Sequence, residues 1–219
     1  MKFYIDLDYT MLDTIKFHEA RYKMLESYGV PKDAQKEMEK YIAEVEKKLI
    51  NLDYLCTKIS EKYNLPTEEV LTQLHKIVDN CYIYLYDDTI EFLQYLKSRG
   101  HQTCMLTWGD IELQEEKARG ARIEKYFDEI ITTDELKFKI DIDYANGIFL
   151  DDNPRDLEGL YKNNPKEVIR IKREGGKYSE KPLNIDIKEY KTLRELQQRL
   201  EQESGENQRR RQEREELEI

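Results

Sequence analysis

Cysteine is scarce in this chain of 219 residues, and the scarcity limits the kinds of protein it can be. The three cysteines, Cys56, Cys81 and Cys104, are far apart and each lies among apolar residues. Disulfide-rich scaffolds and structural zinc sites need several closely spaced cysteines, so the sequence argues against both. We expect three reduced thiols buried in the core.

Long apolar runs are absent as well. No stretch approaches the roughly 20 residues that a membrane-spanning helix needs. The chain also does not open with a basic segment followed by an apolar one, as a secretory signal would. We therefore expect a soluble, cytoplasmic protein without a membrane partner, present as a monomer or a weak homodimer.

Basic residues are fewer than acidic ones. Lys and Arg number 36 against 46 Asp and Glu, which gives a net charge of −10. Nucleic-acid binding depends on neutralising phosphates with Lys and Arg, so a nucleic-acid partner is not expected. A small anionic substrate remains compatible with this balance, because a bound metal ion and a single Lys can reverse the local field.

The most informative feature is a pair of carboxylates that follows the first apolar run. Asp6 and Asp8, separated by one residue, come directly after the segment 3–5. In extended backbone, residues i and i+2 point to the same side, so the two carboxylates should converge. Like charges that close raise each other's pKa unless a cation neutralises them. Mg²⁺ is the expected cation, since it prefers oxygen ligands and works with one or two carboxylates.

Two further apolar runs end in polar groups. The run 103–106 leads into Thr107-Trp108-Gly109-Asp110, and the run 147–150 leads into Asp151-Asp152. In parallel α/β sheets, ligands bind outside the carboxyl ends of the strands. Three such strand ends therefore predict one site. Asp110 is expected to cap the helix that begins at Ile111.

These motifs, in this order, resemble those of the haloacid dehalogenase-like hydrolase superfamily, most of whose members are Mg²⁺-dependent phosphatases. Asp6, Asp8 and Thr10 match its Asp-x-Asp-x-Thr signature, Thr107 its second motif, and Asp151-Asp152 its acidic fourth motif. The resemblance covers roughly residues 1 to 173. The third motif is a Lys, for which Lys139 fits the spacing better and Lys137 is the alternative. The helix that usually follows this Lys is shortened or absent here.

The resemblance implies a role for each matched position. Asp6 would be the nucleophile that forms an aspartyl-phosphate, and Asp8 the acid and base that serves the leaving oxygen and then water. Thr107 and Lys139 would bind the phosphoryl group and complete the catalytic set. The metal ligands would be Asp6, the backbone carbonyl of Asp8, Asp152 and Asp151.

Three further residues are candidates for substrate contact: Trp108, Gly109 and His18. Trp108 either lines the pocket or packs against the inserted helices. The substrate would be a small phosphorylated metabolite. Asp8 favours phosphate esters over dehalogenation, while a phosphomutase of the same superfamily stays open. A non-catalytic binding or scaffold protein with this fold is the other alternative.

The pattern along the chain predicts an α/β fold, with a Rossmann-like parallel sheet core, helices on both faces and an inserted all-helical cap. The core would be discontinuous, comprising residues 1–12 and 87–190. Residues 13–86 would form the cap, with helices over 13–28, 31–52, 53–63 and 67–82. Residues 191–219 would form a last helix and a charged tail, frayed or disordered because it carries almost no apolar residue.

Overall fold

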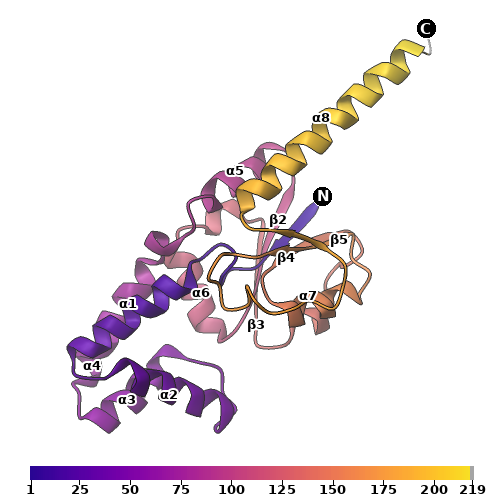
Figure 1. Ribbon diagram of the computed structural model, residues 1–219. Helices are drawn as coiled ribbons and strands as arrows, with labels where there is room; N and C mark the ends of the chain where they lie inside the picture. Colours follow the sequence, from indigo (N-terminus) through magenta and orange to yellow (C-terminus); the bar gives the residue numbers. More distant parts are fainter. Residues whose placement is uncertain (218–219) are drawn as a thin grey trace.

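The computed structural model describes the backbone of residues 1–217 and the side chains of residues 1–205 (Figure 1). Its centre is a sheet of six strands in the order β3-β2-β1-β4-β5-β6, and every neighbouring pair is parallel. The strands are β1 (Lys2–Ile5), β2 (Gln102–Trp108), β3 (Glu129–Thr133), β4 (Gly147–Asp151), β5 (Glu167–Ile171) and β6 (Lys188–Tyr190). This confirms the predicted α/β class. The edge strand β6, which has three residues and is largely exposed, was not among the predicted elements.

Eight α-helices accompany the sheet in the described residues: α1 (Thr14–Ser27), α2 (Lys32–Glu44), α3 (Leu52–Tyr63), α4 (Thr67–Asp79), α5 (Thr89–Ser98), α6 (Ile111–Gly120), α7 (Pro154–Tyr161) and α8 (Leu193–Leu217). None of them combines the length and the apolar character needed to cross a membrane. The predicted second helix is too long by eight residues, because the backbone leaves the helix after Glu44 and Lys47 takes a left-handed conformation with φ of 57°.

Alternation along the strands separates the core into two layers. Phe3 and Ile5 of β1 belong to a large cluster that includes Leu96 of α5 and Leu196 of α8. Tyr4, between them, joins a smaller cluster on the other face together with α7. Helices thus cover both faces, as predicted. The segment after β3 holds only a 3-10 turn, η3 (Lys137–Lys139), so the expected shortening of the helix at this point is confirmed.

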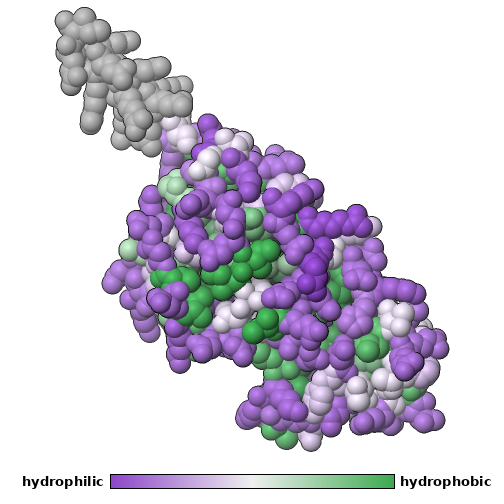
Figure 2. All heavy atoms as spheres, turned by 180° about the vertical axis from the view of Figure 1, so that it is seen from behind, coloured by the Kyte–Doolittle hydropathy of each residue, from purple (hydrophilic) through white to green (hydrophobic). Residues whose placement is uncertain are grey.

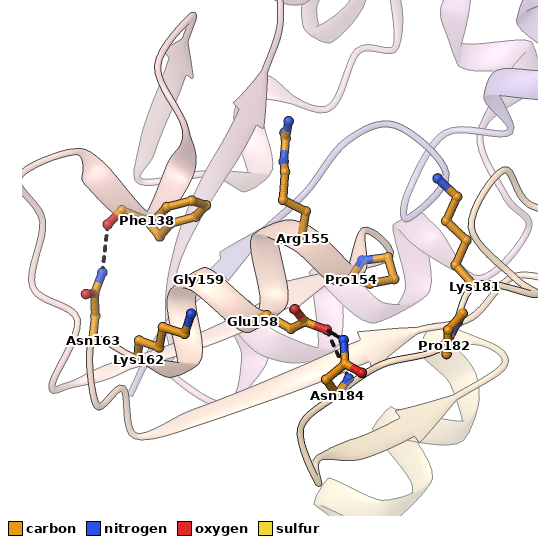
Figure 3. A pocket seen from close by; sticks show the side chains of 10 residues that line it. All are labelled: Phe138, Pro154, Arg155, Glu158, Gly159, Lys162, Asn163, Lys181, Pro182 and Asn184. Atoms are coloured by element: carbon orange, nitrogen blue, oxygen red, sulfur yellow. Dashed lines mark hydrogen bonds between the residues drawn. The ribbon is translucent and has the colours of Figure 1, made fainter.

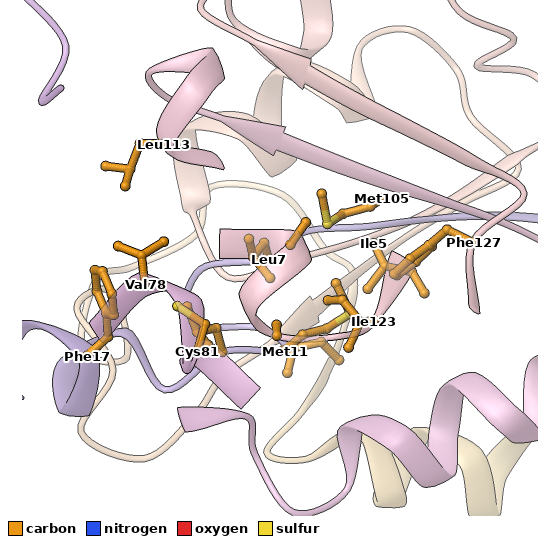
Figure 4. Packing of buried hydrophobic residues seen from close by; sticks show 14 of the residues in the cluster. Ile5, Leu7, Met11, Phe17, Val78, Cys81, Met105, Leu113, Ile123 and Phe127 are labelled. Atoms are coloured by element: carbon orange, nitrogen blue, oxygen red, sulfur yellow. The ribbon is translucent and has the colours of Figure 1, made fainter. Parts of the chain in front are cut away.

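The segment between β1 and α5 is helical, and its two connections to the core run side by side. Leu12 and Leu85 form an antiparallel bridge, the Asp13 N–H donates to the Tyr84 carbonyl, and the Tyr86 N–H donates to the Met11 carbonyl. We refer to residues 13–86 as the helical insert. Its base shares the main hydrophobic cluster with the first loop of the core. Figure 4 shows this packing around Leu7 and Cys81.

A buried ion pair fixes the second connection to the start of α8. Asp88 is 1 % exposed and accepts hydrogen bonds from both terminal nitrogens of Arg173, at 2.8 and 2.7 Å, and from the Leu193 N–H. Arg173 also donates to the Thr10 carbonyl in the first loop. One Arg thus joins the loop after β1, the connection before α5 and the end of β5.

The helix α8 carries the charged C-terminal segment. It extends to Leu217, so the backbone is helical where its composition predicts fraying or disorder, and residues 218 and 219 lie outside the described residues. Figure 2 shows that the surface seen from behind is mostly hydrophilic, interrupted by small groups of hydrophobic side chains. The three cysteines are free and buried, as expected.

Candidate active site

The carboxyl ends of β1 and β4 bring three carboxylates together. Ile5 of β1 pairs with Leu150 of β4, and the Asp6 N–H continues the ladder by donating to the Leu150 carbonyl at 2.9 Å. One carboxylate oxygen from each of Asp6, Asp151 and Asp152 lies within 4.8 Å of the others, and all three residues are buried. This group, which we call the acidic triad, unites residues that are about 145 positions apart in the chain.

Lys137, and not Lys139, is the lysine of this site. Its Nζ donates to an Asp6 carboxylate oxygen and, at 2.7 Å, to Oδ2 of Asp151, while its side chain is 3 % exposed. Lys139, the residue preferred on spacing, is exposed on the far side of the same 3-10 turn. The prediction fails because a turn of three residues per revolution places positions 137 and 139 on different sides.

The electrostatics of the acidic triad favour a bound cation. Burial, together with the charges of Asp151 and Asp8, raises the pKa of Asp6 to about 8, although the Lys137 ammonium opposes the shift. Burial and the charges of Asp151 and Asp6 raise the pKa of Asp152 to about 9. Among the described residues, none donates a hydrogen bond to the Asp152 carboxylate, which is 7 % exposed. A buried carboxylate without a partner beside two others is a suitable donor set for a hard divalent cation, so these residues fit Mg²⁺.

The Asp8 carboxylate does not converge with Asp6 but turns toward α6. The Lys117 Nζ lies 2.8 Å from both Asp8 oxygens, and Thr14 and Gln114 donate to the same carboxylate at 2.7 and 3.0 Å. Although burial acts in the other direction, the Lys117 charge and these hydrogen bonds lower the pKa of Asp8 to about 2. The predicted convergence fails because these partners from α1 and α6 hold the Asp8 carboxylate outside the acidic triad.

Lys117 and Gln114 are functional candidates that the sequence analysis missed. They are 4 % and 5 % exposed, and they lie three positions apart on the buried face of α6 with Leu113 and Ala118. The sequence signal for such residues is a polar side chain on the helix face that otherwise carries apolar residues. Charged side chains are seldom buried without a partner, so a Lys on that face indicates a buried carboxylate beside it. None of the family motifs matched in the sequence includes a residue of this helix.

The second motif is placed next to the first. Thr107 is fully buried in β2, and its hydroxyl donates to Gln114 Oε1 at 3.4 Å. The Trp108 indole N–H donates to the Asp134 carbonyl at 3.1 Å, and the Arg155 guanidinium lies 5.2 Å from the Trp108 ring centroid. Trp108 is thus half-buried, and both of these contacts are with the α/β core and not with the helical insert. Asp110 caps α6 by accepting from the Leu113 N–H, as predicted.

Gly109 is engaged within the fold. Its N–H donates to the Thr133 carbonyl at 2.9 Å, so this amide is not free to bind a phosphate. A Cβ at this position would lie 2.6 Å from the Gln114 amide nitrogen. Glycine is thus required for the close approach of Gln114, and through Gln114 for the placement of Asp8.

His18 lies on α1, on the side of the helical insert that faces the first motif. The Arg21 side chain approaches His18 Nδ1 at 3.0 Å, and Arg21 is paired with Glu39 of α2. Burial and the positive charges of Arg21 and Lys117 lower the pKa of His18 well below its usual value, so the imidazole is neutral. Its ring stacks on Tyr22 with centroids 6.0 Å apart.

A separate cavity of about 550 Å³ lies beside α7 (Figure 3). Its lining includes Phe138, Pro154, Lys162 and Lys181, and Glu158 in its floor is held by Asn184 at 2.8 Å. None of the acidic triad lines it. In Figure 3 the Arg155 side chain extends away from Lys181 and Glu158, which agrees with its contact with Trp108.

Comparisons with known proteins agree with this architecture. A family profile described as haloacid dehalogenase-like hydrolase matches residues 4–164. An L-2-haloacid dehalogenase from Xanthobacter autotrophicus superimposes with a TM-score of 0.63 at 15% identity, covering 91% of this chain and 98% of that one. A protein from Bacillus subtilis described as the HAD-hydrolase YfnB, bound to magnesium, gives 0.60 at 15% identity, with 89% and 96% covered. A search among curated proteins found no match.

Proposed function

Because the chain belongs to the haloacid dehalogenase-like hydrolase family, we propose that it is a magnesium-dependent phosphomonoesterase. It acts on a small phosphorylated metabolite through an aspartyl-phosphate on Asp6. The observation that carries the proposal is the buried contact of Lys137 with Asp6 and Asp151, beside the unpaired Asp152. A carboxylate with an ammonium at its side can receive a phosphoryl group, because the cation offsets the charge that accumulates as two anions approach.

The reaction has two halves. First, an Asp6 carboxylate oxygen attacks phosphorus, the ester P–O bond breaks, and the leaving oxygen takes a proton from Asp8 in its protonated form. Then water attacks the phosphorus of the aspartyl-phosphate, Asp8 takes the water proton, and inorganic phosphate leaves with Asp6 restored. Lys117 favours the ionised form of Asp8, which is the form that the second half requires.

Magnesium would be held by Asp6, Asp151 and Asp152. When bound, it neutralises the acidic triad and lets an anionic phosphoryl group approach Asp6. Lys137 orients Asp6 and Asp151 through its two hydrogen bonds. The Thr107 hydroxyl, which donates to Gln114, would donate to a phosphate oxygen.

Asp8 favours ester hydrolysis over dehalogenation. A halide leaves without a proton, so a dehalogenase has no need of an acid two residues after its nucleophile. The alkoxide that leaves a phosphate ester does need a proton. Three side chains, from Lys117, Thr14 and Gln114, bind the Asp8 carboxylate, which is the degree of positioning that such a proton transfer requires.

The test is phosphate release from a panel of phosphate esters, with Mg²⁺ and with a chelator. We expect release only with the metal, and none from Asp6→Asn, which keeps the size of the side chain. Lys139→Met is the matched control, because this exposed Lys lies outside the site and its loss should leave the rate unchanged. Turnover by Asp6→Asn within tenfold of the parent, or equal rates with and without divalent ions, would refute the proposal.

A further inference from the structure

The cavity beside α7 has walls from three separate parts of the chain. Phe138 of η3, Gly159 of α7 and Pro182 of the β5–β6 connection all line it (Figure 3). Its volume of about 550 Å³ lies in the range of sites that bind small organic molecules. Because none of the acidic triad lines it, the proposed reaction makes no use of this space.

One wall of the cavity is an aromatic ring that lies directly on a helix. A Cβ at Gly159 would lie 2.1 Å from the Phe138 ring, so glycine at this position is what lets the ring approach α7 so closely. The Asn163 side-chain amide donates to the Phe138 carbonyl at 2.9 Å and fixes the turn that carries the ring. Phe138 is half-buried, so part of its surface is available to a ligand.

The acidic group in the floor already has its partners. Glu158 Oε1 accepts from the Asn184 backbone N–H at 2.9 Å and from the Asn184 side-chain amide at 2.8 Å. These bonds tie α7 to the β5–β6 connection and leave the space between them unfilled. The Arg155 guanidinium is paired with Asp156 and lies over the Trp108 ring, so its charge is engaged elsewhere.

Two ammonium groups of the lining are not engaged in this way. Lys162 and Lys181 are both exposed, and in the part of the chain that the structure describes neither forms a salt bridge or a side-chain hydrogen bond. Figure 3 shows them on either side of Glu158. Two Lys against one Glu give the lining an excess of one positive charge, in a protein whose net charge is −10.

We propose that this cavity is a second binding site, whose ligand is a small carboxylate built on an aromatic ring. The ring packs against Phe138 and Pro182, and the carboxylate pairs with Lys162 or Lys181. A single negative charge matches the excess of the lining. Since Phe138 directly follows Lys137 in η3, the ligand contacts the turn that holds the lysine of the candidate active site.

The test is a titration with 2-naphthoate, followed in the amide NMR spectrum of the full chain without Mg²⁺. Without the metal, the acidic triad does not attract an anion, and the measurement needs no turnover, so it is independent of the proposed reaction. We expect saturable binding with a Kd below about 1 mM, as is usual for a ligand of this size. The largest shifts should be at the amides of Phe138, Gly159 and Asn163. The neutral 2-naphthamide, which has the same shape, should bind about threefold more weakly.

Variants of the lining make the result specific to the cavity. Lys162→Met combined with Lys181→Met should weaken 2-naphthoate binding about fivefold and remove its advantage over the amide. Lys166→Met combined with Lys177→Met is the matched control, because it changes the net charge equally at two exposed lysines outside the lining, and it should leave the affinity unchanged. Phe138→Leu should weaken both ligands about threefold, since the ring contact is lost. An absence of saturable binding, shifts centred on another part of the protein, or equal losses in the two double variants would overturn the inference.

Discussion

The contact between Lys117 and Asp8 gives a prediction whose size can be worked out from the structure. Lys117→Met keeps the length of the side chain and removes its charge. The Asp8 pKa of about 2 lies below its ordinary value of 3.8. One pKa unit corresponds to about 1.4 kcal/mol, so the interactions that favour ionised Asp8 contribute about 2 kcal/mol, of which Lys117 supplies most. Loss of this partner should therefore destabilise the folded protein by about 2 kcal/mol at pH 7.

The pH dependence of this loss identifies its origin. A group whose folded pKa is depressed contributes stability above its unfolded pKa, and the contribution disappears as pH falls through the folded pKa. The difference between Lys117→Met and the parent should therefore be largest near pH 7 and should shrink as pH falls from about 4 to about 2. Urea unfolding at a series of pH values measures it. Lys40→Met, at a side chain that is 70% exposed, is the control and should cost less than about 0.5 kcal/mol.

Activity provides a second measure of the same contact. Without Lys117, the pKa of Asp8 rises. Because hydrolysis of the aspartyl-phosphate needs ionised Asp8, the acid limb of the pH profile for kcat should move to higher pH by about one unit when that step limits turnover. A stability loss that is the same at pH 3 and pH 7 would show that Lys117 acts through packing. An acid limb that does not move would show that Asp8 is not the titrating group.

Three other predictions follow from single contacts. Asp152→Asn should raise the stability of the metal-free protein at pH 8 by about 1–3 kcal/mol and weaken Mg²⁺ binding, because it removes a carboxyl group that must take up a proton on folding. A stability at pH 8 no higher than that of the parent would contradict this. Since the pKa of Asp152 is raised to about 9, folded protein binds more protons than unfolded protein between pH 4 and 9, and metal-free stability should fall over that range in the parent but less in the variant. Arg173→Met should cost about 3–5 kcal/mol in urea unfolding because it leaves Asp88 buried without its partner, and a cost below 1 kcal/mol would refute the pairing. Gly120→Ala should lower the free energy of unfolding by about 1–3 kcal/mol, because a Cβ there would lie 1.9 Å from the Val78 carbonyl oxygen, where α6 meets α4. Gly205→Ala is the control: this position in α8 has open space around it, so the substitution should stabilise the protein slightly.

The convergence of three strand ends could be predicted from the sequence because each apolar run ends in a motif residue. Asp6, Thr107 and Asp151 mark the carboxyl ends of β1, β2 and β4, and the parallel register brings those ends together. The same logic predicted Asp110 as a helix cap, which depends only on neighbours in the chain. Features that depend on neighbouring residues or on the alternation along a strand could thus be predicted from the sequence.

The rest depends on contacts between distant segments, which spacing does not encode. Lys139 fitted the expected spacing, but the 3-10 geometry of η3 selects Lys137. Asp8 belongs to the expected motif, yet its direction is decided by Lys117, more than a hundred residues away. The left-handed conformation of Tyr9, directly after Asp8, is likewise not indicated by any pattern in the sequence.

Two buried lysines divide the four carboxylates of the site into groups with different tasks. Lys137 pairs with Asp6 and Asp151, and Lys117 pairs with Asp8. If all four carboxylates are ionised, two cations against four anions leave a net charge of −2 in a region that is largely closed to water, which agrees with the raised pKa values of Asp6 and Asp152. One divalent cation is the charge that such a site lacks. With the cation in place the carboxylates balance, and a phosphoryl group can then enter beside Lys137 without facing uncompensated negative charge. The arrangement thus links metal binding to the proposed reaction, because a bound cation would replace the protons on Asp6 and Asp152 and leave Asp6 ionised for attack on phosphorus.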